Sequence, residues 1–464
     1  MLDYTLNIGL AACRRWLPGK RTGIFNPEYA QANKRVVESY VREHYTDEQT
    51  RFTDLSFLND EGMMFDHAQA ETIAEKFKAE KVDALFIINC NFGCEEVAAK
   101  LARLLQVPTL IWAPQDTIFE PDGTRYTDAQ CGLFAMSKQL TRYRVPFEHI
   151  ENCPVDAPVF ARGFERFLSV ACMLKNFRKL RIAQVGMRPR PFTSVIFNEG
   201  ELVERFGIDV VPVNMPAVTE IFQTVLQDKQ TELAADVKLL KERYSDTGGL
   251  DDAALTRMAA FRETFRRIML DTNAQVISTE CWTCMLQAVD AMPCIAMSQL
   301  ADERMIVTCE SDVCGAITMA LLSCASRGRS VPFFGEFTVR HPHNQNGELL
   351  WHCGPFAWSL KKPQSPANIF NMKPSFRVKD GLYTIARFDS AEGRYSLLNG
   401  NFRSIEGPHT FGTYIWAEFD DYRKWEKKLI YGPYIHHMAE IEGDYTEALE
   451  AFCRHVPGLV SDRP

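Results

Sequence analysis

Acidic residues follow two strand-like segments in the middle of the chain. Glu280 comes directly after the apolar segment 275–279, and Asp312 follows the segment 305–309. The carboxyl ends of neighbouring parallel strands meet at one edge of a sheet, where open α/β sheets bind ligands. Two carboxylates at such an edge repel each other unless one is protonated or a cation lies between them. The pattern favours a divalent-cation site, although an acid at this position can also serve as a helix N-cap.

Histidines in the last third of the chain could complete such a site. His436 and His437 are adjacent, and His352 lies in a separate segment, 349–355. Neighbouring side chains on a strand point to opposite faces, so only one of the adjacent pair is expected to face a cation. Carboxylates together with an imidazole suit Mg²⁺ or Mn²⁺ better than a thiolate-selecting metal.

These segments resemble the metal-binding core of the L-fucose isomerase and L-arabinose isomerase superfamily. The similar stretches are 278–280, 292–294, 309–312, 349–355 and 434–438. The resemblance implies that Glu280, Asp312 and His437 hold the metal, and that the two acids also carry protons during catalysis. It implies a place near the metal for His352, either as a fourth ligand or as a substrate contact. Trp282, beside Glu280, is expected at the substrate.

Arginines near two further strand ends are candidates for binding an anionic group. The start of the chain, an Ile-Gly strand followed by Arg14 and Arg15, looks like the fucose isomerase start, where arginine reaches substrate. Arg188 and Arg190 follow the predicted strand 180–186, and an arginine there could hold an anion with two hydrogen bonds. A solvated turn is the alternative interpretation of that second pair.

The resemblance implies a metal-dependent aldose–ketose isomerase from a shorter, fucose-isomerase-like branch. The sugar stays open, with a hexose or a 6-deoxy or 6-sulfo hexose, such as fucose or sulfoquinovose, as the expected monosaccharide. Mn²⁺ is the metal implied, with Mg²⁺ and Co²⁺ as alternatives. The family also implies a homo-oligomer, a trimer or hexamer, with active sites near subunit interfaces that Arg14 or Trp16 would reach.

Two other classes of function compete with the isomerase. A non-catalytic sugar-binding or regulatory protein could be built from the same two Rossmann-like domains, because fold does not determine function. A thiol oxidoreductase would rest on the CxxC pair Cys281 and Cys284 alone, and a redox pair needs a lowered thiol pKa at a helix N-terminus.

The elements that must position these residues form three regions. Strand–helix alternation predicts a Rossmann-like parallel-sheet domain over residues 1–170 and a second one over 171–330 that carries the acids. Short alternating segments predict an antiparallel, barrel-like β-rich domain over residues 331–464, with a closing helix at 444–455. The chain is therefore expected to be an α/β protein with a C-terminal β domain.

Composition argues against several partners. The net charge is −8 and no basic stripe is present, so nucleic-acid binding is not expected. No run of 18 apolar residues and no signal peptide is seen, which predicts a cytoplasmic protein without a membrane span. The 14 cysteines are then expected to be reduced thiols.

Overall fold

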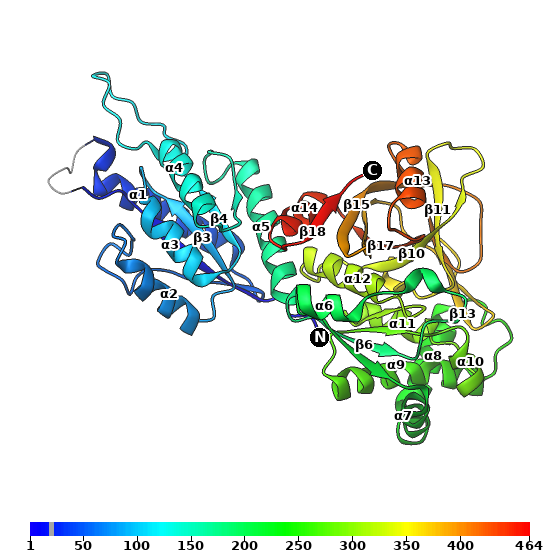
Figure 1. Ribbon diagram of the computed structural model, residues 1–464. Helices are drawn as coiled ribbons and strands as arrows, with labels where there is room; N and C mark the ends of the chain where they lie inside the picture. The colour runs from blue at the N-terminus through cyan, green and yellow to red at the C-terminus, as the bar shows by residue number, and fades with distance from the viewer. Residues whose placement is uncertain (18–22) are drawn as a thin grey trace. The chain divides into compact units, whose positions relative to one another are not determined.

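A computed structural model describes residues 1–17 and 23–464 of the chain (Figure 1). Contacts divide it into two compact units, one of residues 4–175 and one of residues 1–3 and 176–464. The first unit contains a five-stranded parallel sheet in the order β2-β1-β3-β4-β5. Its strands are β1 (Leu6–Cys13), β2 (Thr50–Thr53), β3 (Ala84–Asn89), β4 (Thr109–Trp112) and β5 (Glu148–His149). Its helices are η1 (Gly23–Phe25), α1 (Pro27–Tyr45), α2 (Gln69–Ala79), α3 (Glu95–Leu105), α4 (Ala129–Arg142) and α5 (Pro158–Phe177), the last of which runs on into the second unit.

Helices cover both faces of this first sheet. On one face, strand residues such as Ile87 pack with apolar residues of α2, α3 and α4. On the other face, Phe86 and Trp112 contact the rings of Phe160 and Phe164 on α5. A sheet covered on both faces explains why every residue of β1 and β3 is buried and why most of these residues are apolar instead of alternating with polar ones.

The second unit begins with a four-stranded parallel sheet in the order β7-β6-β8-β9. Its strands are β6 (Arg181–Val185), β7 (Asp209–Val213), β8 (Val276–Thr279) and β9 (Ile306–Thr308). Its helices are η2 (Thr193–Val195), α6 (Glu199–Phe206), α7 (Met215–Asp228), α8 (Gln230–Arg243), α9 (Asp252–Thr272), α10 (Cys284–Val289), α11 (Cys294–Asp302) and α12 (Val313–Ala325).

The rest of this unit is a nine-stranded, mostly antiparallel sheet that closes on itself. Strands β16, β11, β10, β17, β14 and β15 pair in a circuit because β15 also pairs with β16, so they form a barrel. The strands are β10 (Phe333–Arg340), β11 (Gly347–His352), β12 (Asn368–Phe370), β13 (Lys373–Arg377), β14 (Leu382–Ala391), β15 (Arg394–Ile405), β16 (Thr413–Glu418), β17 (His437–Glu442) and β18 (Leu459–Asp462). The helices are η3 (Trp358–Leu360), α13 (Tyr422–Tyr431) and α14 (Thr446–Arg454).

Helix α12 joins the two halves of this second unit. It contacts β8 and β9 of the parallel sheet and also β14 and β17 of the barrel. Every residue of α12 is buried, as expected for a helix enclosed on all sides. The residues at its N-terminus are therefore held next to the barrel strands.

The predicted fold class is confirmed, since two parallel α/β sheets precede a barrel-like β region. The predicted boundaries at residues 170 and 330 stay a prediction. The apolar segment 294–297, which the sequence pattern predicts to be a third strand beside 275–279 and 305–309, is instead helical, because Cys294 begins helix α11. The first seven residues of α11 are all buried, so its sequence shows no helical period and a short apolar run cannot be told from a strand. Among the described residues, no helix is long and apolar enough to cross a membrane.

Candidate functional site

The turn after β9 carries two acidic residues in different backbone states. Glu310 and Ser311 have positive φ angles of 66° and 55°, which turns the chain sharply out of the sheet. Asp312 then caps α12, with its Oδ1 accepting a 2.8 Å hydrogen bond from Gly315 N–H. Any side chain at Gly315 would collide with the ring of Phe334 on β10, so the barrel packs closely on this turn.

Asp312 is a buried carboxylate held by two basic groups. Its Oδ2 lies 2.6 Å from Arg387 Nη1 and 2.9 Å from His437 Nδ1, and Arg387 Nε donates to Asp389 at 2.9 Å. Burial alone would raise the pKa of Asp312, but Arg387 and His437 outweigh it and lower the pKa well below its usual value. Asp312 is therefore an ionised acceptor, and the Nδ1 of His437 donates to it.

The other ring nitrogen of His437 faces a second carboxylate. Its Nε2 lies 3.2 Å from Glu310 Oε2, is buried, and has no hydrogen-bond partner. With Nδ1 protonated, a neutral imidazole presents a lone pair at Nε2. This lone pair and the carboxylate oxygen of Glu310 repel each other unless a proton or a cation lies between them. Although burial opposes it, the bond to Asp312 and the nearness of Glu310 raise the pKa of His437, so a proton can take that place.

Barrel strands bring two more side chains to the same point. Glu336 on β10 lies directly opposite His437 on β17 in the antiparallel register. His352 ends β11, and its Nε2 is 3.6 Å from Glu336 Oε1 and also lacks a hydrogen-bond partner. Ligand atoms of Glu310, Glu336, His352 and His437 all lie within 4.8 Å of one another. Burial raises the pKa of Glu336.

Glu280, the first predicted ligand, makes different contacts. Its Oε1 accepts hydrogen bonds from Thr283 N–H at 2.7 Å and from the Thr283 hydroxyl, and its Oε2 accepts from Cys284 N–H at 2.8 Å. Both carboxylate oxygens thus cap the short helix α10. Glu280 does not belong to the group of ligand atoms around His437. Its role as a metal ligand stays a prediction. The same holds for Asp312, which contacts Nδ1 of His437, the ring nitrogen that does not face Glu310.

The predicted substrate-binding residues lie in varied surroundings. In the first unit, Arg14 is paired with Glu61, with Nη2 2.9 Å from Oε1, and Arg15 is paired with Glu95. In the second unit, Trp282 is 44% exposed after β8. Their roles as substrate contacts stay predictions.

Arg188 lies in the turn after β6. Its Nη1 donates only to backbone carbonyls, those of Pro189 and Arg190, at 3.3 and 3.2 Å. No ion pair with Arg188 is present among the described residues. The same turn places the Phe192 ring edge-on to His437, with centroids 5.1 Å apart.

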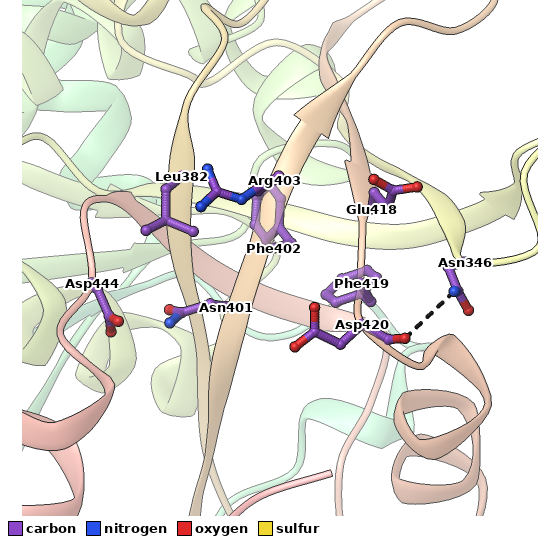
Figure 2. Close-up of a pocket in the computed structure, with 9 residues that line it drawn as sticks. All are labelled: Asn346, Leu382, Asn401, Phe402, Arg403, Glu418, Phe419, Asp420 and Asp444. Carbon is purple, nitrogen blue, oxygen red and sulfur yellow. Dashed lines mark hydrogen bonds between the residues drawn. The ribbon is translucent and has the colours of Figure 1, made fainter.

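The barrel also carries a surface pocket of about 480 Å³ that shares no residue with this group (Figure 2). Its wall mixes amides, three carboxylates and one arginine, and it is lined by Asn346, Leu382, Asn401, Phe402, Arg403, Glu418, Phe419, Asp420 and Asp444. No imidazole faces this pocket, so the acid–histidine group remains the candidate site.

Two members of that group, Glu310 and Glu336, were not predicted. Glu310 stands within the 309–312 segment that carried the resemblance, but the resemblance implied Asp312, the acid immediately before the helix, as the ligand. Glu336 was missed because it sits inside a barrel strand and not at a sheet edge. The available signal was one acid within an otherwise apolar run, 333–337.

Comparisons with known proteins give a consistent relationship. The family described as fucose/sulfoquinovose isomerase, N-terminal domain, matches residues 17–178. The sulfoquinovose isomerase of Priestia aryabhattai is 25% identical over 387 residues, covering 81% of this chain and 84% of that protein. The sulfoquinovose isomerase of Alkalicoccus urumqiensis is also 25% identical, covering 71% and 74%. A galactofuranose binding protein of known structure aligns with a TM-score of 0.15 and 12% identity over 70% of this chain and 99% of its own, too low to indicate a shared fold.

The matching N-terminal family and the long alignments to sulfoquinovose isomerases both point to the same kind of protein. Residues 17–178 match the fucose/sulfoquinovose isomerase family, and together the findings support a place for the chain among the fucose isomerase-like sugar isomerases.

Proposed function

We propose that this isomerase works with one divalent cation held by Glu310, Glu336 and His437, and that its substrate is an anionic hexose of the sulfoquinovose type. The observation that carries the proposal is the unpartnered His437 Nε2, 3.2 Å from Glu310 Oε2. Asp312 fixes the opposite ring nitrogen, as a carboxylate commonly does behind a metal-ligating histidine.

The donor set fits a hard cation. Two carboxylates and an imidazole suit Mn²⁺ or Mg²⁺, and Mn²⁺ is the metal that the family resemblance implies. A bound divalent cation would polarise the oxygens at C1 and C2 of an open-chain sugar. His437 must be neutral to act as a ligand, so the proton held in its absence has to leave when the cation binds.

The protein's own residues would hold and move the protons. Aldose–ketose conversion moves one proton between C2 and C1 and another between the two oxygens. Burial raises the pKa of Glu336, which brings this carboxyl closer to the neutral range where general acid–base groups work well. Glu310, on the neighbouring turn, is the second carboxylate within reach of the same point. His352 Nε2 faces the group as a donor to Glu336 or to a substrate oxygen.

Arg188 is the proposed contact for the anionic end of the sugar. It makes no ion pair with a described carboxylate, and its turn packs Phe192 against His437. A sulfonate could accept two hydrogen bonds from a free guanidinium. Arg14 is less suited because Glu61 already occupies its guanidinium.

The test is a panel of aldoses, including sulfoquinovose, glucose and L-fucose, assayed after chelator treatment and again after Mn²⁺ is restored. We expect ketose formation only with added metal, and fastest with sulfoquinovose. Equal turnover in chelator would contradict the role of the cation. Binding of sugar without any conversion would instead favour the non-catalytic sugar-binding alternative.

One variant tests whether Arg188 binds the anionic group of the substrate without taking part in the isomerisation itself. Arg188→Met should raise KM for sulfoquinovose by at least about tenfold, corresponding to one charge-assisted hydrogen bond, and leave slow turnover of a neutral aldose unchanged. Arg190→Met, a change in the exposed neighbour, is the matched control and should alter neither value. An equal loss with both sugars would show that Arg188 acts on the fold or the metal site and not on the anion.

A further inference from the structure

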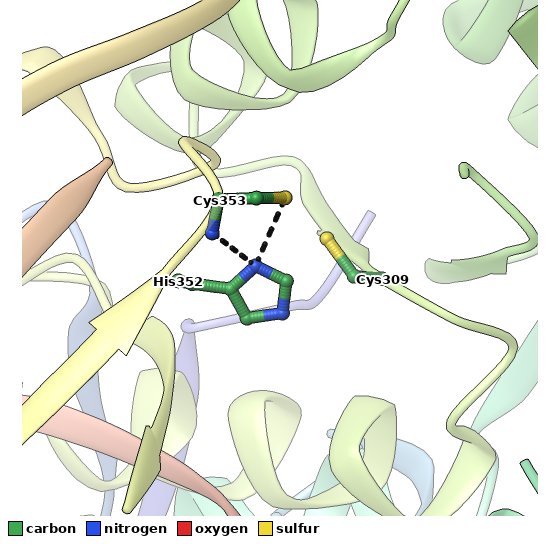
Figure 3. Close-up of side chains that lie close together, drawn as sticks. All are labelled: Cys309, His352 and Cys353. Carbon is green, nitrogen blue, oxygen red and sulfur yellow. Dashed lines mark hydrogen bonds between the residues drawn. The ribbon is translucent and has the colours of Figure 1, made fainter. Parts of the chain in front are cut away.

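Behind the acid–histidine group lies a second set of ligand atoms with different chemistry. The two nitrogens of His352 face different partners, since Nε2 points to Glu336 and Nδ1 lies 3.3 Å from Cys353 Sγ. Cys309 Sγ joins them, with sulfur and imidazole ligand atoms within 4.8 Å of one another (Figure 3). Cys294 Sγ is 3.8 Å from Cys353 Sγ, so a third thiol lies next to this set without belonging to it.

Separate elements bring these side chains together. Cys309 follows β9, His352 and Cys353 end and follow β11, and Cys294 is the first residue of α11. Cys294 and Cys309 are fully buried, while Cys353 is half-buried.

The turn after Cys353 depends on glycine. Gly354 has a φ of 146°, and a Cβ there would lie 2.9 Å from Pro374 O and 2.8 Å from Pro374 Cδ. Any other residue would push the turn away from β13. Glycine therefore allows Cys353 to sit against both Cys294 and the imidazole.

The spacing suits a thiophilic cation. In a tetrahedral zinc site with Zn–S bonds of about 2.3 Å, two sulfur ligands are about 3.8 Å apart. The Cys294–Cys353 separation has this value. Thiolates with an imidazole select Zn²⁺ or Cd²⁺ over the hard cations that carboxylates prefer. His352 Nδ1 accepts a 2.8 Å hydrogen bond from Cys353 N–H, so it presents a lone pair on the sulfur side.

We propose that Cys309 and Cys353, with His352 Nδ1, form a second metal site that binds one thiophilic divalent cation such as Zn²⁺ or Cd²⁺, with the neighbouring thiol of Cys294 as the candidate fourth ligand. Each cysteine supplies a thiolate, and the cation replaces the Cys353 N–H as the partner of Nδ1. The site shares the His352 ring with the acid–histidine group but uses its other nitrogen, and it needs no isomerase activity to be occupied. If no cation binds at these cysteines, the proposed isomerase function is unaffected.

The experiment is a Cd²⁺ titration of the full-length protein, reduced with a phosphine so that no added thiol competes for metal, and freed of metal with a chelator. Excess Mg²⁺ is kept present to occupy carboxylate sites. Thiolate-to-cadmium charge transfer in the ultraviolet reports sulfur ligation alone. We expect a saturable band with an end point of one Cd²⁺ per chain, and native mass spectrometry should show the same stoichiometry.

Variants show which cysteines give rise to the thiolate-to-cadmium band. Cys353→Ser and Cys309→Ala should each weaken Cd²⁺ binding by at least about tenfold, since even partners outside the ligand shell are worth that much. Cys131→Ser, an exposed single thiol, and Cys453→Ala, a buried thiol outside the cluster, should leave the band unchanged. Circular dichroism checks that each variant is folded, and Cys353→Ser, at the half-buried position, is the mildest change.

Two results would overturn the proposal. One is the absence of a thiolate band at Cd²⁺ concentrations well above the protein concentration. The other is a band that survives both cluster variants and disappears in Cys131→Ser, which would assign cadmium to surface thiols.

Discussion

Glu280 and Glu310 occupy equivalent positions and do different things. They follow the adjacent parallel strands β8 and β9, and both are largely shielded from solvent. Glu280 receives hydrogen bonds on both oxygens from the residues that follow it in sequence. Glu310 Oε2 instead faces the unpartnered Nε2 of His437, which comes from a distant part of the chain.

The comparison shows what separates a structural acid from a functional one. A strand end places a carboxylate at the sheet edge in both cases, so position alone does not decide. Buried polar groups in proteins are normally hydrogen-bonded, so an unpartnered buried nitrogen requires an explanation. Glu280 is fully satisfied by its own helix, whereas the surroundings of Glu310 are complete only with a positive charge added.

The largest expected effect comes from removing the negative charge at each of these two positions. Glu310→Gln removes a proposed ligand and should lower kcat by about 100-fold or more, as expected for loss of a group that positions or moves protons. Glu280→Gln should keep most of its turnover and lose about 1–3 kcal/mol of unfolding free energy, because the capping carboxylate loses its charge. Steady-state kinetics in saturating Mn²⁺ and urea unfolding measure the two effects.

The paired variants also decide between two assignments. If Glu280→Gln loses turnover while Glu310→Gln keeps it, the ligand set predicted from sequence stands and the proposed one falls. Metal content of each purified variant, measured by elemental analysis, shows whether a loss of turnover follows a loss of the cation.

Much of the site's framework could be predicted from sequence, because local patterns report local structure. The strand–helix alternation indicated the place of Asp312 before α12, and resemblance pointed to His437 and His352, which the structure brings to one group. Glu336 could not be found this way, since its partner His437 lies about a hundred residues further on and only the β10–β17 register places them opposite each other. The difference between Glu280 and Glu310 likewise depends on tertiary contacts.

The next prediction tests whether Asp312 strengthens binding of the proposed cation by holding the ring of His437. Asp312→Asn keeps an acceptor for His437 Nδ1 but removes the charge, and should weaken Mn²⁺ binding by about 10–100-fold. Asp389→Asn is the matched control because Asp389 also pairs with Arg387 without contacting His437. Calorimetric titration with Mn²⁺ measures both variants.

Both changes leave Arg387 with one ionised partner instead of two, so both should lower the unfolding free energy. Only the change at Asp312 should alter the affinity for Mn²⁺ strongly. Equal losses of affinity would show that the network acts through Arg387 and not through the imidazole.

The smallest expected effect concerns a third buried carboxylate, which neither caps a helix nor faces an unpartnered imidazole. Glu348 on β11 is 2% exposed, and burial raises its pKa to about 7, only partly offset by a hydrogen bond with Tyr422. An unfolded glutamate has a pKa of about 4.3. Between these values the folded chain binds more protons than the unfolded one, so Glu348 lowers stability as the pH rises through this window.

Glu348→Gln removes that ionisation and should leave stability at about pH 5 nearly unchanged while raising it at about pH 8 by about 2 kcal/mol relative to the parent chain. Urea unfolding at the two pH values measures the difference. The direction is opposite to that at Glu280, where the charge is needed and its loss destabilises. A Gln variant less stable at the higher pH would mean that Glu348, like Glu280, has partners that stabilise its charge.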